Sequence, residues 1–178
     1  MSSSVTPAEP IRVAILTVSD ATARGEREDV SGPLLAKLVT AQGMEVVARD
    51  TVADVRGDIA GWLRHWAAQA EVLLTTGGTG LGPRDVTPEA TRDVISYEVP
   101  GITEALRVDS LHHTPMAMLS RAVAGVVDRT VIVNLPGSPR AVEQQFRVLG
   151  PVLAHAVALL HGVTAHPPAE DGAAPHAD

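Results

Sequence analysis

A glycine-rich segment with charged residues at its end is the part of this sequence best suited to chemistry. In TTGGTGLGPRDVTPEAT (75–91), an apolar run ends at two threonines, four glycines follow, and Arg84 and Asp85 precede Thr87-Pro88. Glycine permits sharp turns and lets a ligand approach the backbone N–H groups. Such N–H groups bind anions at glycine-rich turns and at helix starts. The segment therefore predicts a phosphate site.

A second segment, NLPGSP (134–139), repeats this design. In both segments glycine lies between an apolar strand and a helix, and a hydroxyl residue able to cap the helix, Thr87 or Ser138, precedes a proline. Two such loops at one sheet edge predict a ligand with several phosphates, or two ligands. The alternative is a pair of tight strand-to-helix turns. Neither segment matches a P-loop or a Rossmann fingerprint.

Carboxylates follow several of the expected strands. Asp85 ends the glycine-rich segment, Asp54 follows the second strand, and Asp20 and Asp29 lie in SDATARGEREDVSG (19–32) after the first. Carboxylates beside a phosphate site repel the ligand unless a cation bridges them, and Mg²⁺ accepts carboxylate and phosphate oxygens together. The set therefore predicts a magnesium site. The alternative for each single aspartate is a turn residue that accepts backbone hydrogen bonds.

Other candidate groups are weaker. The pair His112-His113 suits metal binding, but a solvated or hydrogen-bonded pair in a loop is the alternative. Ser120-Arg121 suits anion binding, but a turn serine and a helix-surface arginine are the alternative. His166 and His176 fall in a segment expected to be solvated. The sequence contains neither a G-x-S-x-G nor an H-E-x-x-H motif.

Strand and helix patterns alternate between these motifs. This order predicts an α/β domain with a mostly parallel sheet, whose ligands bind beyond the carboxyl ends of the strands. Strands are expected at 11–18, 44–52, 71–76 and 130–135. Helices are expected at 31–43, with Ser31 as its cap and Gly43 at its end, and at 57–70, 87–96, 102–108 and 138–160, the last bent at Gly150-Pro151.

Composition excludes several classes of function. The 178 residues suit one domain, expected at 11–162, with disordered tails at 1–10 and 163–178. The net charge of −7 argues against a nucleic-acid binder. The absence of cysteine excludes disulfides and thiolate sites. The sequence has no signal peptide pattern and no apolar run near the ~20 residues of a membrane helix, so a cytoplasmic location is expected.

The motifs ILTVSD, GEREDVSG, TTGGTGLGPRDVTPEAT, PGITEALR, MLSR and NLPGSP, in this order, resemble the MogA/MoaB-type molybdopterin-binding family. The resemblance spans roughly residues 11 to 162. It implies a three-layer α/β/α sandwich, usually a homotrimer. It also implies that the terminal phosphate of molybdopterin attacks the α-phosphate of ATP with Mg²⁺ present, which gives adenylyl-molybdopterin and pyrophosphate. The product would pass to a molybdate-inserting partner of the MoeA type.

The resemblance also assigns residues. It implies that Asp85 and Asp54 are catalytic and hold Mg²⁺, although Ala53-Asp54-Val55 departs from the family's usual Pro-Asp followed by an acidic residue. Ser120 and Arg121 match a pair in the pterin pocket. The remaining binding residues that it implies, for the phosphates and the nucleotide, are Ser19, Asp20, Thr75, Thr76, Gly77, Gly78, Thr79, Gly80, Asn134, Leu135, Pro136, Gly137, Ser138 and Pro139.

Three alternatives to the adenylyltransferase stay open at this point. The first is a paralogue of the MoaB type, which binds molybdopterin without catalysis; the presence of both Asp54 and Asp85 favours the enzyme. The second is a scaffold protein like the gephyrin relatives. The third is an unrelated α/β nucleotide hydrolase, which would hydrolyse ATP without pterin.

Overall fold

The computed structural model describes residues 9–163. The two tails expected at 1–10 and 163–178 lie almost wholly outside the described residues. His166 and His176 lie outside them as well.

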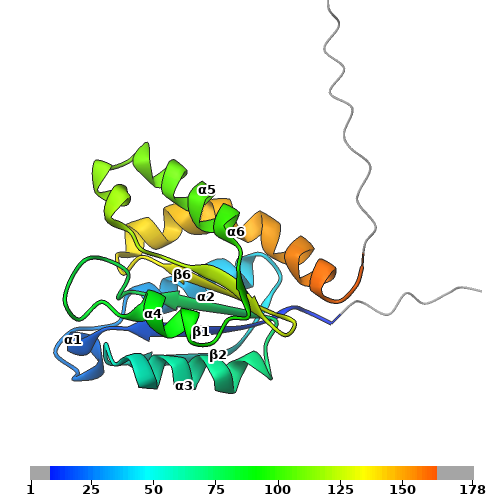
Figure 1. Ribbon diagram of the computed structural model, residues 1–178, viewed down its shortest axis with the longest axis horizontal. Helices are drawn as coiled ribbons and strands as arrows, with labels where there is room; N and C mark the ends of the chain where they lie inside the picture. The colour runs from blue at the N-terminus through cyan, green and yellow to red at the C-terminus, as the bar shows by residue number, and fades with distance from the viewer. Residues whose placement is uncertain (1–8, 164–178) are drawn as a thin grey trace, which may run out of the picture.

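A six-stranded sheet forms the middle of the molecule, in the order β2-β1-β3-β6-β5-β4 (Figure 1). Its strands are β1 (Arg12–Val18), β2 (Glu45–Val52), β3 (Val72–Thr76), β4 (Tyr97–Glu98), β5 (Ala124–Val127) and β6 (Thr130–Leu135). Strands β2, β1, β3 and β6 run parallel, whereas β5 and β4 are antiparallel to their neighbours. The sheet is therefore mostly parallel, as the sequence predicted.

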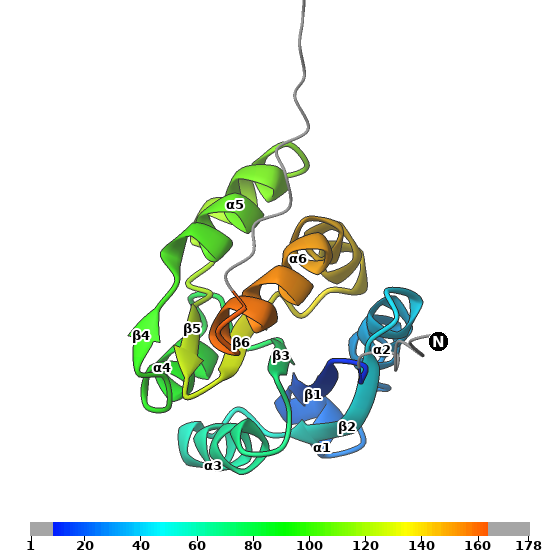
Figure 2. The same ribbon diagram turned by 90° about the vertical axis from the view of Figure 1, so that its right-hand side faces the viewer.

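Helices cover both faces of the sheet, which gives the three-layer α/β/α sandwich expected from the sequence (Figure 2). The helices are α1 (Asp20–Ala23), α2 (Ser31–Ala41), α3 (Arg56–Ala67), α4 (Thr87–Arg92), α5 (Pro100–Leu111), the 3-10 helix η1 (Pro115–Leu119) and α6 (Pro139–Leu160). Helices α2, α5 and α6 pack on one face. Helices α3 and α4 pack on the other.

The central strands are buried on both faces because their side chains alternate between two cores. Val13 and Ile15 of β1 contribute to the core under α2 and α6, whereas Ala14 and Leu16 contribute to the core under α3 and α4. A strand covered on both faces needs apolar residues at every position, which explains the unbroken run in β1. The two cores fix the carboxyl ends of β1, β3 and β6 at one edge of the sheet.

Two of the predicted helix caps are wrong. The Ser31 hydroxyl donates to the carbonyl of Gly137 (2.8 Å) instead of capping α2, and the α2 amide of Gly32 bonds to Asp29 Oδ1 (2.9 Å). The Thr87 hydroxyl donates to the carbonyl of Gly77 (2.9 Å) and does not cap α4. Ser138 does cap α6, since its hydroxyl accepts a bond from Ala141 N (3.3 Å). Ser31 and Thr87 are the first residues of their helices, whereas Ser138 precedes α6 and so occupies the capping position.

The sequence patterns did not predict α1, β4, β5 and η1, and they predicted α5 too short. The four elements that were not predicted have two to five residues, which is too few to show a helical or strand period. Helix α6 continues through Pro151 to Leu160. Although α6 has 22 residues, no helix within 9–163 is long and apolar enough to cross a membrane.

Candidate functional site

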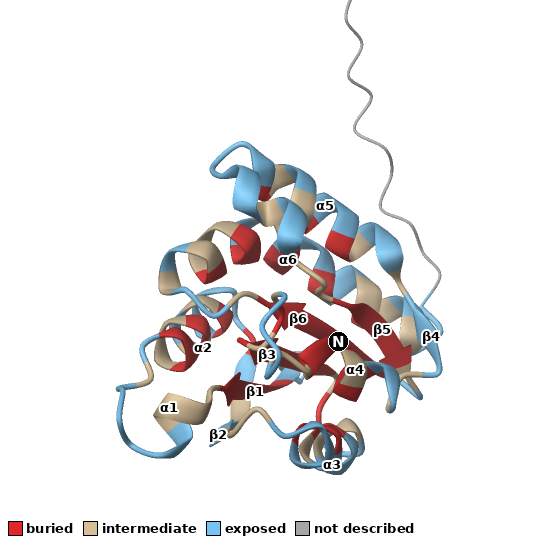
Figure 3. Cartoon of the chain, turned by 60° about the vertical axis from the view of Figure 1, so that its left-hand side comes forward, coloured by how far each residue is buried: buried red, intermediate tan, exposed pale blue. Residues whose placement is uncertain are grey.

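A cavity of about 590 Å³ opens at the carboxyl ends of β1 and β3. The loops after β1, β2, β3 and β6 all contribute to its wall, as expected for a ligand site on a parallel sheet. Most of the sheet beneath it is buried, whereas the rim is partly exposed (Figure 3). The strands therefore provide a rigid floor and the loops provide the polar groups.

The two glycine-containing loops meet in this wall. The glycine-rich loop (residues 77–86) joins β3 to α4, and the β6–α6 loop (residues 136–138) follows the neighbouring strand. Gly137 approaches Gly77 so closely that a Cβ atom on Gly137 would lie 3.3 Å from the Gly77 Cα. The Thr76 hydroxyl donates to the Pro136 carbonyl (2.7 Å) and joins the loops further. A single ligand can thus contact both loops.

Backbone amides of both loops are available to an anion. Within the part of the chain that the structure describes, the N–H groups of Gly78, Thr79, Gly137 and Ser138 have no hydrogen-bond partner. Those of Gly137 and Ser138 precede the first turn of α6, where the helix dipole adds positive potential. Arg27 is the only cation among the described residues that line the cavity. These groups together suit phosphate oxygens.

Two carboxylates, Asp54 and Asp85, face the same cavity. Asp54 Oδ2 accepts the amide of Asp20 (2.8 Å) and Asp85 Oδ2 accepts the amide of Gly82 (3.0 Å). The Oδ1 atoms of both accept no hydrogen bond within residues 9–163. The same described range has no group of three or more His, Asp or Glu side chains placed to hold a metal. Two single oxygens suit Mg²⁺ only if phosphate and water complete its shell, which is common for this ion.

Burial raises the pKa of Asp54, and the negative charges of Asp20 and Asp85 raise it further, against a backbone hydrogen bond that lowers it. The ionised Asp54 is therefore electrostatically costly without a cation nearby. This is the situation expected of a carboxylate that binds a metal ion together with its ligand.

Asp20 and Asp29 have other partners. Asp20 Oδ1 accepts the Asp54 amide (3.0 Å), and both Asp20 oxygens accept from Arg84 at 3.0 Å. The hydrogen bonds from Arg84 are the main reason that the pKa of Asp20 is lowered. Asp29 accepts the Thr17 hydroxyl (2.8 Å) and the Gly32 amide (2.9 Å). Asp29 therefore holds the loop after β1, in line with the turn alternative.

A second cavity, of about 240 Å³, lies beside the first. Thr79, Gly80, Ser120 and Pro136 line it, together with Met116, Leu119 and Gln145. Gln145 is buried and donates to the Ser110 hydroxyl (3.0 Å), but its Oε1 has no hydrogen-bond partner among the described residues. A buried acceptor without a partner costs free energy, so a donor group of a ligand would stabilise it.

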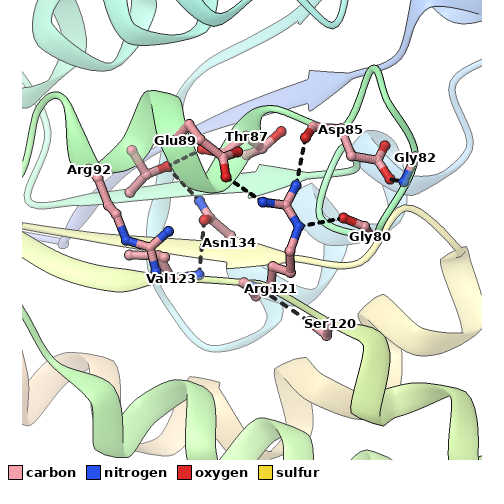
Figure 4. A network of polar contacts seen from close by, with 12 residues as sticks. Gly80, Gly82, Asp85, Thr87, Glu89, Arg92, Ser120, Arg121, Val123 and Asn134 are labelled. Atoms are coloured by element: carbon pink, nitrogen blue, oxygen red, sulfur yellow. Dashed lines mark hydrogen bonds and ion pairs between the residues drawn. The ribbon is translucent and has the colours of Figure 1, made fainter.

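The Ser120-Arg121 pair is divided by the structure. Ser120 faces the second cavity, whereas Arg121 lines neither cavity and turns toward the glycine-rich loop (Figure 4). Asn134 is wholly buried: its Nδ2 donates to Thr75 (3.0 Å) and Thr91 (2.8 Å). The Asn134 side chain therefore holds β3, β6 and α4 together and has no exposed atom for a ligand.

The structure thus sorts the predicted residues by location. The first cavity is lined by Ser19, Asp29, Asp54, Thr76, Gly77, Gly78, Asp85, Gly137, Ser138 and Pro139. Thr79, Gly80, Ser120 and Pro136 line the second. Thr75, Asn134 and Leu135 are buried beneath both. His112 and His113 are exposed, follow the end of α5 and line neither cavity.

Several residues that line the first cavity were not predicted from the sequence, namely Thr17, Thr22, Arg27, Glu28, Val30 and Ser31. The signal that could have found most of them is the motif GEREDVSG itself. It follows the first strand, so its residues had to lie at the same edge of the sheet.

A family model described as a probable molybdopterin binding domain matches residues 14–155. Among curated relatives, the molybdenum cofactor synthesis protein cinnamon of Drosophila melanogaster is 40% identical, over 85% of this chain and 26% of its own length. The molybdopterin adenylyltransferase of Helicobacter pylori is 34% identical, over 86% of this chain and 90% of its own. The chain spans between about a quarter and a half of the first curated relatives that it matches.

Solved structures agree with this match. The molybdopterin biosynthesis enzyme MoaB of Thermus thermophilus is 47% identical, with a TM-score of 0.81 over 85% of this chain and 97% of the other. A structure of MogA is 39% identical, with a TM-score of 0.80 over 84% of this chain and 99% of the other. Both the fold and the sequence therefore match the same family.

Proposed function

The chain belongs to the molybdopterin-binding family of molybdenum cofactor biosynthesis, and from this premise we propose that it is a molybdopterin adenylyltransferase. An oxygen of the terminal phosphate of molybdopterin attacks the α-phosphorus of ATP. The bond from that phosphorus to the bridging oxygen breaks, and pyrophosphate leaves. One observation supports this proposal above the others. Two glycine-containing loops with free amides meet beside two carboxylates, and each carboxylate has one oxygen that accepts no hydrogen bond from residues 9–163.

The first cavity is proposed to bind the triphosphate of ATP. The free amides of Gly78, Gly137 and Ser138 and the cationic Arg27 surround it. Phosphoryl-type transfer needs positioning and charge neutralisation more than covalent help from the protein. Fixed amides supply both, because they are oriented before the ligand arrives.

Asp54 and Asp85 would hold Mg²⁺ through their Oδ1 atoms. Bound there, the ion would neutralise charge on the phosphate oxygens. The backbone amides would then orient the phosphates. Asp54 and Asp85 would fix the position of the ion. Arg84, paired with Asp20, limits the negative charge at the rim of the cavity.

The second cavity is proposed to bind the pterin. Its apolar wall, from Met116 and Leu119, suits a flat ring, and the buried Gln145 Oε1 suits a ring N–H donor. Thr79 and Gly80 line this cavity, while their neighbours Gly77 and Gly78 line the first. The terminal phosphate of a pterin bound here would therefore lie next to the ATP site, as the reaction requires.

Homotrimer formation and transfer of the product to a MoeA-type partner are further parts of this proposal. One relative, from Synechococcus elongatus, is named a molybdenum cofactor biosynthesis bifunctional protein, and this chain matches 47% of it. That name is consistent with a second step joined to this domain. Light scattering on the purified protein would give its mass, and a monomer would contradict the trimer.

An assay of adenylyl transfer tests the proposed function. Purified protein is mixed with molybdopterin, ATP and Mg²⁺, and adenylyl-molybdopterin and pyrophosphate are followed by mass. We expect product with the wild type and a loss of about a hundredfold or more in turnover for Asp85→Asn, since one electrostatic group is removed. Asp58→Asn, on the exposed start of α3, is the control and should retain activity.

Other results would contradict the proposal. Pterin binding without product from the wild type would identify a non-catalytic binding paralogue of the MoaB type. ATP hydrolysis without pterin would identify a nucleotide hydrolase. A near-wild-type rate for Asp85→Asn would refute the metal-binding role of Asp85.

A further inference from the structure

The glycine-rich loop has little structure of its own. Its residues 81–84 are exposed, and its internal backbone bonds are few: Asp85 N donates to the Gly82 carbonyl (2.9 Å), and Thr87 N donates to the Gly78 carbonyl (3.1 Å). Glycines add conformational freedom to such a loop. Yet Asp85 must keep its place opposite Asp54 for the two to share a ligand. Something outside the loop must therefore fix it.

Arg121 contacts both ends of the exposed part of this loop. Its Nε donates to the Gly80 carbonyl (2.7 Å) and its Nη2 donates to the Asp85 carbonyl (2.6 Å) (Figure 4). The Arg121 amide also donates to the Thr79 carbonyl (2.9 Å). A planar guanidinium with fixed donor directions can set the spacing between two carbonyls, which a lysine cannot do.

Glu89 completes the arrangement from α4. Its Oε1 pairs with Arg121 Nη1, and its Oε2 is buried with no hydrogen-bond partner among the described residues. Burial alone would raise the pKa of Glu89, but the hydrogen bond from Arg121 and a backbone bond more than offset it, so that the pKa is lowered. Glu89 is thus ionised and forms an ion pair with Arg121.

The parts that hold Arg121 and Glu89 belong to the rigid body of the protein. Asn134 accepts the amide of Val123, two residues after Arg121, at 3.1 Å, and donates to Thr91 of α4 at 2.8 Å. Asn134 and Thr91 are wholly buried. Arg121 therefore connects the exposed glycine-rich loop to a buried network of hydrogen bonds.

We propose that Arg121 is a positioning residue that holds the glycine-rich loop in its binding form and acts through Asp85, with Glu89 orienting the guanidinium. We call Arg121, Glu89 and the carbonyls of Gly80 and Asp85 the Arg121 clamp. The inference rests on the proposed function only where it concerns activity. In this proposal Arg121 acts without contacting the substrates, because it lines neither cavity, whereas the family resemblance implied a place in the pterin pocket.

Two measurements on the free protein test the clamp without any reaction. Hydrogen–deuterium exchange of the peptide covering 77–86 is compared among wild type, Arg121→Lys, Arg121→Met and Glu89→Gln. We expect exchange in this peptide to rise by about tenfold in Arg121→Met and less in the other two, because local opening governs exchange. Arg92→Lys is the matched control: Arg92 also lies in α4 and pairs with the exposed Glu98, so loop exchange should not change.

A double-mutant cycle then decides between positioning and direct contact. Affinity for Mg²⁺-ATP is measured for Arg121→Met, Asp85→Asn and the double variant. If Arg121 acts through Asp85, the double variant binds no more weakly than Asp85→Asn alone. Additive losses would show that Arg121 contacts the ligand itself and would overturn the proposal. Unchanged loop exchange in Arg121→Met would also overturn it, with folding checked by circular dichroism.

The failure of the proposed function has a different signature. If the wild type yields no adenylyl-molybdopterin but Arg121→Met still raises exchange in 77–86, the clamp stands and the adenylyltransferase does not. If product forms and exchange is unchanged, the enzyme stands and the clamp does not.

Discussion

The two loops that follow β3 and β6 have similar sequences, but the structure uses them differently. The β6–α6 loop has three residues, and the Ser138 hydroxyl caps α6 through Ala141 N. The glycine-rich loop has ten residues, and the corresponding hydroxyl of Thr87 is wholly buried and donates to the Gly77 carbonyl. The short loop is thus held by the helix that follows it and by the hydroxyl groups of Ser31 and Thr76, which donate to its carbonyls. The long loop is held at its start by Thr87 of the following helix, but its exposed part is held by Arg121.

Because the two loops are held differently, they contribute different groups to the cavity. The β6–α6 loop presents amides in line with the 22-residue helix α6, so its geometry comes with the helix. The glycine-rich loop brings Asp85 to the cavity, and Arg121 and Glu89 must fix it from outside. The amides at the start of a helix are oriented by the helix itself. A carboxylate in a long loop is held in position by contacts with other parts of the fold. Substitutions in the two loops should therefore have unequal effects.

The largest difference is expected between Gly78→Ala and Gly137→Ala. Gly78 has φ +65°, and a Cβ atom there would lie 2.4 Å from Thr87 Oγ1 and 2.9 Å from Asp54 Oδ1. We expect a loss of about 3 kcal/mol in the free energy of unfolding, from the left-handed conformation and the steric conflict together. Gly137→Ala, whose Cβ would meet Gly77 Cα at 3.3 Å, should cost far less. Urea unfolding measures both, and equal losses would contradict the distinction.

Thr87→Val should be the next most damaging. Valine has nearly the same side-chain shape as threonine but lacks the hydroxyl group. The buried carbonyl of Gly77 would therefore lose its 2.9 Å hydrogen bond. A buried acceptor without a partner costs about 1–3 kcal/mol. The same denaturation series would detect it, together with weaker Mg²⁺-ATP binding because Gly77 lines the cavity. Unaltered stability would mean that water replaces the hydroxyl.

Ser138→Ala should have a smaller effect, limited to the start of α6. Loss of a serine cap costs about 1 kcal/mol. The first turn of α6 would then open more often, so the affinity for phosphate should fall slightly. Hydrogen–deuterium exchange of residues 77–86 should stay at its wild-type rate. Thermal unfolding and hydrogen exchange would check this, and Ser138→Thr, which retains a neutral cap oxygen, serves as the control. Faster exchange in the glycine-rich loop would show that the two loops are not held separately.

The smallest expected effect is a gain of stability in Asp54→Asn. Because the folded state raises the pKa of Asp54, its ionised form at neutral pH lowers the stability of the fold. The variant should unfold at a slightly higher temperature than wild type at pH 7 without Mg²⁺. This difference should shrink as pH falls through the raised pKa and vanish below the ordinary value of 3.8. Added Mg²⁺-ATP should reverse the order, since the wild type would bind it more tightly and gain more stability from it.

The sequence predicted the main elements well for particular reasons. Apolar runs such as 11–18 and 130–135 are long enough to show a buried strand, and Gly43 ends α2 with φ +78°, as its place after the helix indicated. The short strand β5 carried no such signal, because four residues show no period. Because β5 was not predicted, the antiparallel edge of the sheet was not predicted either. The residues that surround Arg121 could therefore not be identified from the sequence.

The structure brings some of the predicted site residues together and buries others. Motif chemistry selected Gly77, Gly78, Asp54 and Asp85, and all four line one cavity. It could not exclude Asn134, because the residue's burial depends on β3 and α4 packing around it. It also did not select Arg27, although Arg27 lies in the GEREDVSG motif and lines the same cavity.

The sequence alone determined the period of each long element, the loops with free amides and the family to which the chain belongs, because these depend on neighbouring residues. The tertiary structure alone decided what each side chain faces. Ser120 and Arg121 are adjacent in the chain, yet one lines the second cavity and the other holds carbonyls 36 and 41 residues away. Successive residues of an extended segment point to opposite sides, and only the packed sheet determines what lies on each side.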